Sequence, residues 1–198
     1  MIQLIPFASR VAQPWKNGGG STTPIAIAPP GSSLDDFDWR VSLATIAASG
    51  PFSAFPGVDR TLALVEGPGA LLDFEGGRRV PLRAADPICS FAGEEAVTAT
   101  VGGAPTTDFN VMTRRSRCAH RLVRRALAGA AVLAPRGDVS LLFLVEGEGL
   151  SVARDGERIR MERFDAALLD QGAEITLEAD EALVFLVEIH VTPADVSI

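Results

Sequence analysis

Short apolar stretches alternate with polar positions along the whole chain, and glycine, proline and aspartate separate them. A sustained helical period is almost absent, whereas a period of two is typical of a strand with one buried face. The sequence therefore predicts an all-β protein. Short helical turns are expected only at residues 34–37 and 126–131. The clearest strand candidates are residues 39–47, 61–66, 70–74, 96–101, 140–146, 150–154, 174–178 and 182–191.

An internal repeat indicates how these strands are organised. Residues 62–69, Leu-Ala-Leu-Val-Glu-Gly-Pro-Gly, match residues 142–149, Leu-Phe-Leu-Val-Glu-Gly-Glu-Gly, and each run leads into a strand, a glycine hairpin and a second strand. Two copies of such a unit predict two small antiparallel β-barrels or jelly rolls in one chain. We place the first barrel in residues 1–113 and the second in residues 114–198, with strands exchanged between them.

The composition limits the classes of partner. Of the 198 residues, 47% are hydrophobic and 22% are charged, which is typical of a folded domain with a real core. The net charge of −7 disfavours nucleic acid and anionic membranes as partners. No secretory signal or membrane-spanning run is visible, and two cysteines are too few for a disulfide framework. We expect a cytoplasmic protein.

Lys16 is the single lysine beside 17 arginines, and it lies in the segment Pro-Trp-Lys-Asn-Gly-Gly-Gly at residues 14–20. An ammonium is a compact point charge, whereas a guanidinium is a planar fork, so a position that keeps lysine can be one that needs it. The neighbouring glycines permit close backbone approach. Part of a binding site and a simple tight turn with an exposed lysine are equally compatible with this segment.

The strand at residues 39–47 carries polar side chains on one face. Arg40, Ser42 and Ala44 share that face because side chains alternate along a strand. A buried arginine without a partner is costly. These residues therefore either line a wet pocket, or Arg40 pairs with a carboxylate such as Asp108.

The order of strands and glycine turns resembles the cupin fold. In cupin enzymes the metal-binding histidines and glutamate precede the Glu-Gly-x-Gly turn, but here the histidine positions hold Ser53 and Phe55, and Arg60 stands at the glutamate position. The two histidines, His120 and His190, have no second ligand at metal-binding spacing. The resemblance thus implies a cupin without a metal or other cofactor, in which Arg60 can bind an anion.

Four blocks resemble one family in particular, the HutD/Ves family of bicupin proteins. They are residues 15–22, 39–44, 50–60 and 108–115, in matching order and spacing. One departure is Thr23-Pro24, where the family often has a charged residue, which leaves the identity of the ligand in question. The resemblance implies a bacterial cytoplasmic protein that binds a small molecule in a regulatory role, sensing an acidic intermediate of histidine breakdown.

Lys16, Arg40 and Arg60 together would select a small carboxylate, with neutral hydrogen-bonding groups and apolar walls around them. Taken singly, each of these wall residues is more often ordinary core. The full set of candidate ligand-binding residues is Trp15, Lys16, Asn17, Arg40, Ser42, Ser53, Phe55, Arg60, Asp108, Asn110, Met112 and Arg114.

Six arginines lie between Arg114 and Arg125. On an acidic protein, solvated surface or a salt-bridge network between the barrels is favoured for them, ahead of contact with the pocket rim by Arg114 or Arg115 and ahead of contact with nucleic acid.

Catalysis has little support in the sequence. No nucleophile elbow and no phosphate-binding loop is present. The sequence favours binding over catalysis but leaves open an enzyme in which Lys16 or Asp108 transfers a proton. A monomer and a weak homodimer are both compatible with two barrels in one chain.

Overall fold

The computed structural model describes residues 1–172 and 174–192. The described chain is almost entirely β, with one short 3-10 helix, η1, at Phe7–Ser9. None of the helices in this part of the chain is long and apolar enough to cross a membrane. The all-β prediction is therefore confirmed.

The chain divides into two compact units. One, here called the central unit, contains Val11–Cys118. The other, the terminal unit, combines Met1–Arg10 with the chain from Ala119 onward. The division thus falls five residues later than the boundary expected between residues 113 and 114. It also assigns the first ten residues to the unit formed by the second half of the chain.

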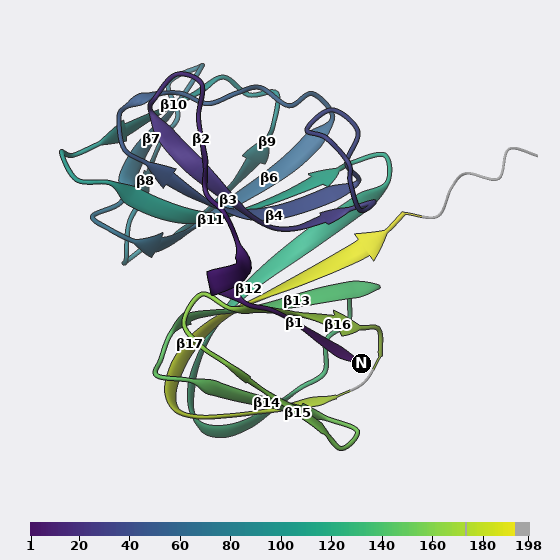
Figure 1. Cartoon of the computed structure of the whole chain (residues 1–198). Coiled ribbons are helices and arrows are strands. Elements are labelled where there is room, and N and C mark those ends of the chain that lie inside the picture. Colours follow the sequence, from purple (N-terminus) through teal and green to yellow (C-terminus); the bar gives the residue numbers. More distant parts are fainter. Residues whose placement is uncertain (173, 193–198) are drawn as a thin grey trace, which may run out of the picture. The chain divides into compact units, whose positions relative to one another are not determined.

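Two antiparallel sheets form the central unit (Figure 1). The larger sheet has the strand order β2-β3-β4-β11-β6-β9, and the smaller has the order β5-β10-β7-β8. Their bounds are β2 Gln13–Pro14, β3 Gly20–Ala28, β4 Trp39–Ile46, β11 Thr106–Arg114, β6 Val58–Glu66, β9 Ile88–Ala92, β5 Gly50–Pro51, β10 Val97–Val101, β7 Ala70–Phe74 and β8 Arg79–Leu82.

Both sheets of the central unit contribute to one hydrophobic core. Ile46 and Leu62 come from the larger sheet, and Leu72 and Phe74 from the smaller. All four are buried. The alternation read from the sequence therefore identifies one face of each sheet as core, as expected for a β-sandwich or barrel.

One sheet forms the terminal unit, with the strand order β1-β16-β13-β17-β14-β15 and with β12 paired to β17. The first strand of the chain thus pairs with a strand near residue 168, and the Ile2 amide donates to the Glu157 carboxylate on β15. The bounds are β1 Ile2–Ile5, β16 Ala166–Asp170, β13 Val139–Glu146, β17 Ile175–Val191, β14 Leu150–Arg154, β15 Glu157–Met161 and β12 Cys118–Leu133.

Two local expectations are wrong. Residues 126–131 lie within strand β12, not in a helical turn, because pairing with β17 outweighs the high intrinsic helix propensity of alanine. Residues 174–178 and 182–191 are not separate strands. Residues 175–178 and 182–191 both fall in the continuous strand β17, which pairs with β14 at one end and with β13 at the other.

Candidate functional site

A cavity of about 580 Å³ opens in the central unit. Strands β4, β6 and β11 supply its floor, and two segments, residues 13–17 and 51–55, supply its walls. Ten of the twelve candidate residues line it, namely Trp15, Lys16, Asn17, Arg40, Ser53, Phe55, Arg60, Asp108, Asn110 and Met112.

The register of three neighbouring strands sets the polar groups side by side. Met112 on β11 lies opposite Arg40 on β4 and opposite Arg60 on β6. One row further along, Asn110 lies opposite Ser42. Because side chains two residues apart on a strand share a face, both rows lie on the same face of the sheet, and Arg40, Arg60, Met112 and Asn110 from these rows line the cavity.

Arg60 is enclosed by aromatic rings. Its side chain is only 7% exposed, and its guanidinium carbon lies 5.2–5.4 Å from the ring centroids of Phe52, Phe55 and Phe91. Its Nη1 donates to the Ser53 carbonyl at 3.4 Å, whereas its Nε has no hydrogen-bond partner among the described residues. Cation–π contacts of this kind favour the cation in an apolar setting.

The pKa of Arg60 is lowered to about 10, mainly by burial; the charge of Asp108 raises this pKa and the charge of Arg40 lowers it. Arg60 therefore remains a cation at neutral pH. Burial also lowers the pKa of Arg40 from its ordinary value. Two like charges share one cavity floor, which is unfavourable unless an anion lies near them.

Asp108 is 1% exposed, and its Oδ1 has no hydrogen-bond partner among the described residues. Burial raises the pKa of this carboxyl to about 7, although the charge of Arg60 lowers it. The Oδ1 of Asn110, one row away, also lacks a partner. The cavity thus has two buried oxygens free to accept a hydrogen bond, or to donate one when Asp108 is protonated.

The pairing of Arg40 with Asp108 that the sequence left open is not formed. Arg40 instead donates from Nη1 to the Ser42 hydroxyl at 3.3 Å. Ser42 is fully buried and does not line the cavity. It contacts Arg40 and orients it, so its candidate role as a direct ligand contact is not supported by its position.

A tight hairpin positions Trp15 and Lys16 at the cavity. The Trp15 amide donates to the Gly20 carbonyl at 2.9 Å, and the indole nitrogen donates to the Thr22 hydroxyl at 2.8 Å. A Cβ on Gly20 would lie 2.2 Å from the Thr45 carbonyl oxygen and 3.0 Å from the indole ring. Only glycine permits this packing.

The next two residues of the hairpin are exposed at the cavity. The Asn17 side chain accepts a hydrogen bond from the Gly19 amide at 3.0 Å, so its Oδ1 shapes the turn. Lys16 extends its ammonium from this fixed turn. Residues 14–20 therefore form a tight turn and also supply part of the cavity wall, so the two interpretations of this segment are compatible.

Arg114 does not line the cavity. Its Nε donates to the Phe37 carbonyl at 3.1 Å and its Nη2 to the Asp35 carbonyl at 2.8 Å. Three more of the clustered arginines form ion pairs, Arg115 with Asp59 and Glu94, Arg117 with Asp38, and Arg121 with Glu188. Each of these pairs joins residues of the same unit, so the expected network between the two barrels stays a prediction.

Several cavity residues were missed from the sequence. Phe52 flanks Arg60, and Leu62 follows it on the same face of β6, so the alternation around Arg60 contained a signal for Leu62. Thr22 lies on the hairpin strand β3, and Leu34 lies in the loop before β4. No local sequence pattern predicts that either residue lines the cavity.

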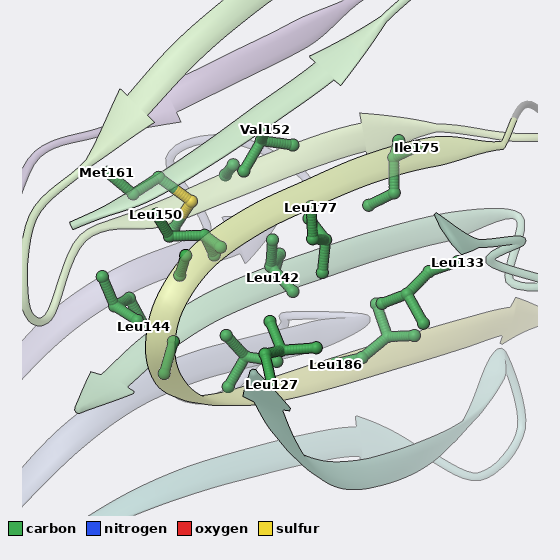
Figure 2. Close-up of a cluster of buried hydrophobic side chains, with 14 of the residues drawn as sticks. Leu127, Leu133, Leu142, Leu144, Leu150, Val152, Met161, Ile175, Leu177 and Leu186 are labelled. Carbon is green, nitrogen blue, oxygen red and sulfur yellow. The ribbon is translucent and has the colours of Figure 1, made fainter. Parts of the chain in front are cut away.

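The same register in the terminal unit places apolar side chains at two positions that are polar in the cavity floor. Leu64 corresponds to Leu144 in the repeat, and the partner of Leu64 is Asp108, whereas the partner of Leu144 is Val184. By the same reasoning Leu186 replaces Asn110. Figure 2 shows Leu142, Leu144 and Leu186 within an apolar cluster. Two polar positions of the cavity floor, Asp108 and Asn110, are thus apolar in the second repeat.

Residues 1–172 and 174–192 contain no group of three or more His, Cys, Asp or Glu side chains that could hold a metal ion. His120 lies on β12 and His190 on β17.

Comparisons with known proteins agree with these features. The chain is 40% identical to protein Ves of Citrobacter koseri over 134 residues, 67% of each chain. It is 32% identical, over 88% of this chain and 90% of the relative, to a Pseudomonas putida protein described as an uncharacterized 21.2 kDa protein in the hutC 3' region.

Solved structures extend the likeness to the fold. HutD from Pseudomonas fluorescens SBW25 matches with a TM-score of 0.81 and 28% identity, over 97% of this chain and 100% of that one. A cupin 2 conserved barrel domain protein from Leptotrichia buccalis, 10% identical with a TM-score of 0.61 over 94% of this chain and 96% of that one, shares the fold alone. The HutD family model matches residues 8–187. With a cupin-like fold and a match over most of its length, this chain belongs to the HutD family.

Proposed function

We propose that this protein binds a small carboxylate metabolite in the cavity of the central unit and acts as a sensor or regulator in histidine utilisation, without a metal. The observation that carries the proposal is a set of three unpartnered buried atoms, Arg60 Nε, Asp108 Oδ1 and Asn110 Oδ1. Each such atom costs about 1–3 kcal/mol when it has no partner. A bound ligand that pairs with them recovers that cost.

The charges favour an anion. Arg40, Arg60 and Lys16 line the cavity together with a single carboxyl, Asp108. Since the pKa of Asp108 is about 7, this group is partly neutral at neutral pH. An arginine fork binds a carboxylate through two directional, charge-assisted bonds.

The other cavity residues and the cavity volume indicate what the ligand carries besides its acid group. Asp108 and Asn110 offer acceptors, so the ligand needs an N–H or O–H donor away from its acid group. Trp15, Phe52 and Phe55 supply apolar wall. A cavity of about 580 Å³ also exceeds the space that a formate or acetate ion fills. An acid bearing a polar ring satisfies all three conditions.

The link to histidine utilisation rests on kinship. The Pseudomonas putida relative is described by its position in the hutC 3' region, and the solved relative from Pseudomonas fluorescens is named HutD. Binding is favoured over chemistry because the cavity contains no serine–histidine or cysteine–histidine pair.

The proposal is tested with two acids and an analogue that lacks the carboxylate. Imidazole-4-acetate should raise the unfolding midpoint and titrate with about one equivalent in calorimetry, acetate should bind more weakly, and the methyl ester of the first acid should not bind. At a hundredfold excess over the dissociation constant, stabilisation should reach about 2.7 kcal/mol. Equal binding of the ester and the acid, or no binding of any acid formed during histidine breakdown, would refute the anion site.

One observation favours a second candidate, an acid–base enzyme. Asp108 is a buried, unpartnered carboxyl with a pKa near neutrality, as catalytic carboxyls often are. The same samples distinguish the two functions, because proton NMR over several hours shows product or solvent deuterium in the bound acid if the protein is an enzyme, and an unchanged ligand if it only binds.

A further inference from the structure

The loop between β3 and β4, residues 29–38, forms one edge of the cavity and is called the rim segment below. Leu34 is its member that lines the cavity, and this side chain is 50% exposed. The loop is closed locally by Asp36, whose Oδ1 accepts from the Ser33 amide at 2.6 Å and the Ser33 hydroxyl at 2.8 Å. These bonds shape the turn but do not attach it to the sheet.

Arg114 makes that attachment. From the end of β11 its guanidinium donates to the carbonyls of Asp35 and Phe37, on both sides of the turn, and it lies 5.5 Å from the Phe37 ring centroid. The Arg114 amide also donates to the Asp38 carbonyl at 2.8 Å. Two bonds from one rigid guanidinium fix both the position and the direction of the segment.

The rim segment also contributes one side chain, that of Phe37, to the hydrophobic core next to the cavity. Phe37 is fully buried in a small cluster with Val58 and Met112, against which Phe55 packs. Met112 and Phe55 both line the cavity. The backbone that Arg114 holds therefore continues on one side into the cavity wall and on the other side to Leu34.

We propose that Arg114 is a positioning residue that gives the site its selectivity for acids with a large non-polar or ring portion, by fixing Leu34 over the cavity. The inference rests on the proposed function, because it requires an acid bound at Arg40 and Arg60. Those two arginines lie on strands β4 and β6 of the floor, outside the rim segment. The acid group and the ring of a ligand are thus recognised by separately supported parts of the site.

This separation has a measurable consequence. Without its guanidinium anchor, the rim segment gains freedom and Leu34 loses its fixed position, so contact with the ligand's ring weakens. Acetate has no ring and is unaffected. A contact of this size, a partly exposed leucine on a ligand ring, corresponds to about a tenfold change in dissociation constant.

The experiment compares Arg114→Ala and Leu34→Ala with wild type, using imidazole-4-acetate by calorimetry and acetate by NMR shift titration. Each variant should weaken binding of imidazole-4-acetate about tenfold and leave acetate within twofold. The double variant should bind imidazole-4-acetate no more weakly than Arg114→Ala alone, because both substitutions remove the same contact, that of Leu34 with the ligand ring. Arg115→Ala is the matched control, since the ion pairs of Arg115 with Asp59 and Glu94 do not involve the rim segment.

The outcomes separate the two ideas. If wild type binds neither acid, the proposed function is wrong and the role of Arg114 is wrong with it. If wild type binds both acids but Arg114→Ala weakens both equally, or changes neither, the anion site stands and the selectivity role of Arg114 is refuted. Should Arg114→Ala fail to fold, Leu34→Ala decides, because a half-exposed side chain can be shortened with little loss of stability.

Discussion

Arg60 and Asp108 lie on neighbouring strands of one sheet, each shifts the pKa of the other, and yet no ion pair forms between them in the described structure. Arg60 Nε and Asp108 Oδ1 are both buried and both without a partner. Opposite charges held near each other without direct contact leave room for a third group. This is the arrangement expected of a site that completes its hydrogen bonds with a ligand.

Arg60→Met should abolish the thermal shift caused by imidazole-4-acetate and leave the unliganded protein within about 1 kcal/mol of wild type. Replacement of a buried charge by an apolar side chain of similar length is often neutral or stabilising, and methionine packs well against the three phenylalanine rings. Unfolding midpoints with and without the acid measure both effects. Arg79→Met, at an exposed arginine paired with Asp73, serves as the control. A loss of several kcal/mol in the unliganded Arg60 variant would instead mark Arg60 as structural.

We expect the contribution of Asp108 to the free energy of unfolding to fall as the pH rises. In the folded state its pKa is about 7, above the ordinary value of 3.8, because burial disfavours the charge. Between these two values the folded carboxyl keeps a proton that the unfolded chain releases. The contribution is therefore fully present below about pH 4 and is lost as the pH rises through 7, with an amplitude on the order of 4 kcal/mol.

Asp108→Asn isolates this contribution, because the amide does not titrate. Urea unfolding of wild type and variant at intervals from pH 4.5 to 8 should show their difference in free energy growing in favour of the variant toward pH 8. Parallel profiles for the two proteins would mean that Asp108 is ionised, and paired, throughout this range. Acetate affinity of wild type should likewise weaken from pH 6 to 8, as a negative charge develops in the cavity, and the variant should lose that dependence.

Gly20→Ala should destabilise the protein by about 1–3 kcal/mol and displace Trp15. The added methyl would meet the Thr45 carbonyl oxygen at 2.2 Å, and backbone cannot yield as a flexible side chain can. Thermal unfolding gives the cost, and tryptophan fluorescence reports the movement of the indole. Gly50→Ala is the control, since a Cβ there meets no heavy atom within 4 Å and the residue has no positive φ. Equal effects of the two substitutions would show that the close contact at Gly20 is unimportant.

Lys16→Arg should weaken binding of imidazole-4-acetate severalfold although the charge is retained. The hairpin fixes the backbone of residue 16, and a planar guanidinium on a longer stem does not take the place of a compact ammonium. Stability should stay unchanged because Lys16 is exposed. Titration calorimetry measures the affinity. Unchanged affinity in this variant and in Lys16→Ala would assign Lys16 to the turn alone.

Purified protein should contain far less than one equivalent of zinc, iron, manganese or nickel by elemental analysis. Prolonged treatment with a chelator should not change its unfolding midpoint or its affinity for imidazole-4-acetate. About one equivalent of a transition metal that resists chelation would contradict the metal-free site.

The fold was predictable where the sequence combines alternation with glycine turns. The two Leu-x-Leu-Val-Glu-Gly runs fall on β6 and β13, as the repeat requires. Strand β3 and the alanine-rich part of β12 were missed, because their side chains are only partly buried and so give no clear apolar period. Edge and linker strands depend on tertiary pairing that local sequence does not encode.

The site was predictable where polar residues interrupt an apolar strand. Arg40, Arg60 and Asp108 are conspicuous for that reason, and all three line the cavity. The role of Ser42 and the position of Arg114 were not predictable, because a buried hydroxyl beside an arginine and a guanidinium on a distant carbonyl follow from three-dimensional contacts. Their residue types alone suggested ligand contacts.

The pairing of β1 with β16 bears on the order in which the chain can fold during synthesis. Residues 2–5 leave the ribosome before their partners at residues 166–169, which follow more than 160 residues later. At about 5–20 residues per second, this apolar strand waits on the order of ten seconds or more. The Val11–Cys118 unit, with its cavity, contains all its own strands and can close in that interval. The nascent chain can therefore form the binding site before β16, the pairing partner of β1, has been synthesised. A ligand that binds at that stage stabilises the Val11–Cys118 unit during folding as well as in the finished protein.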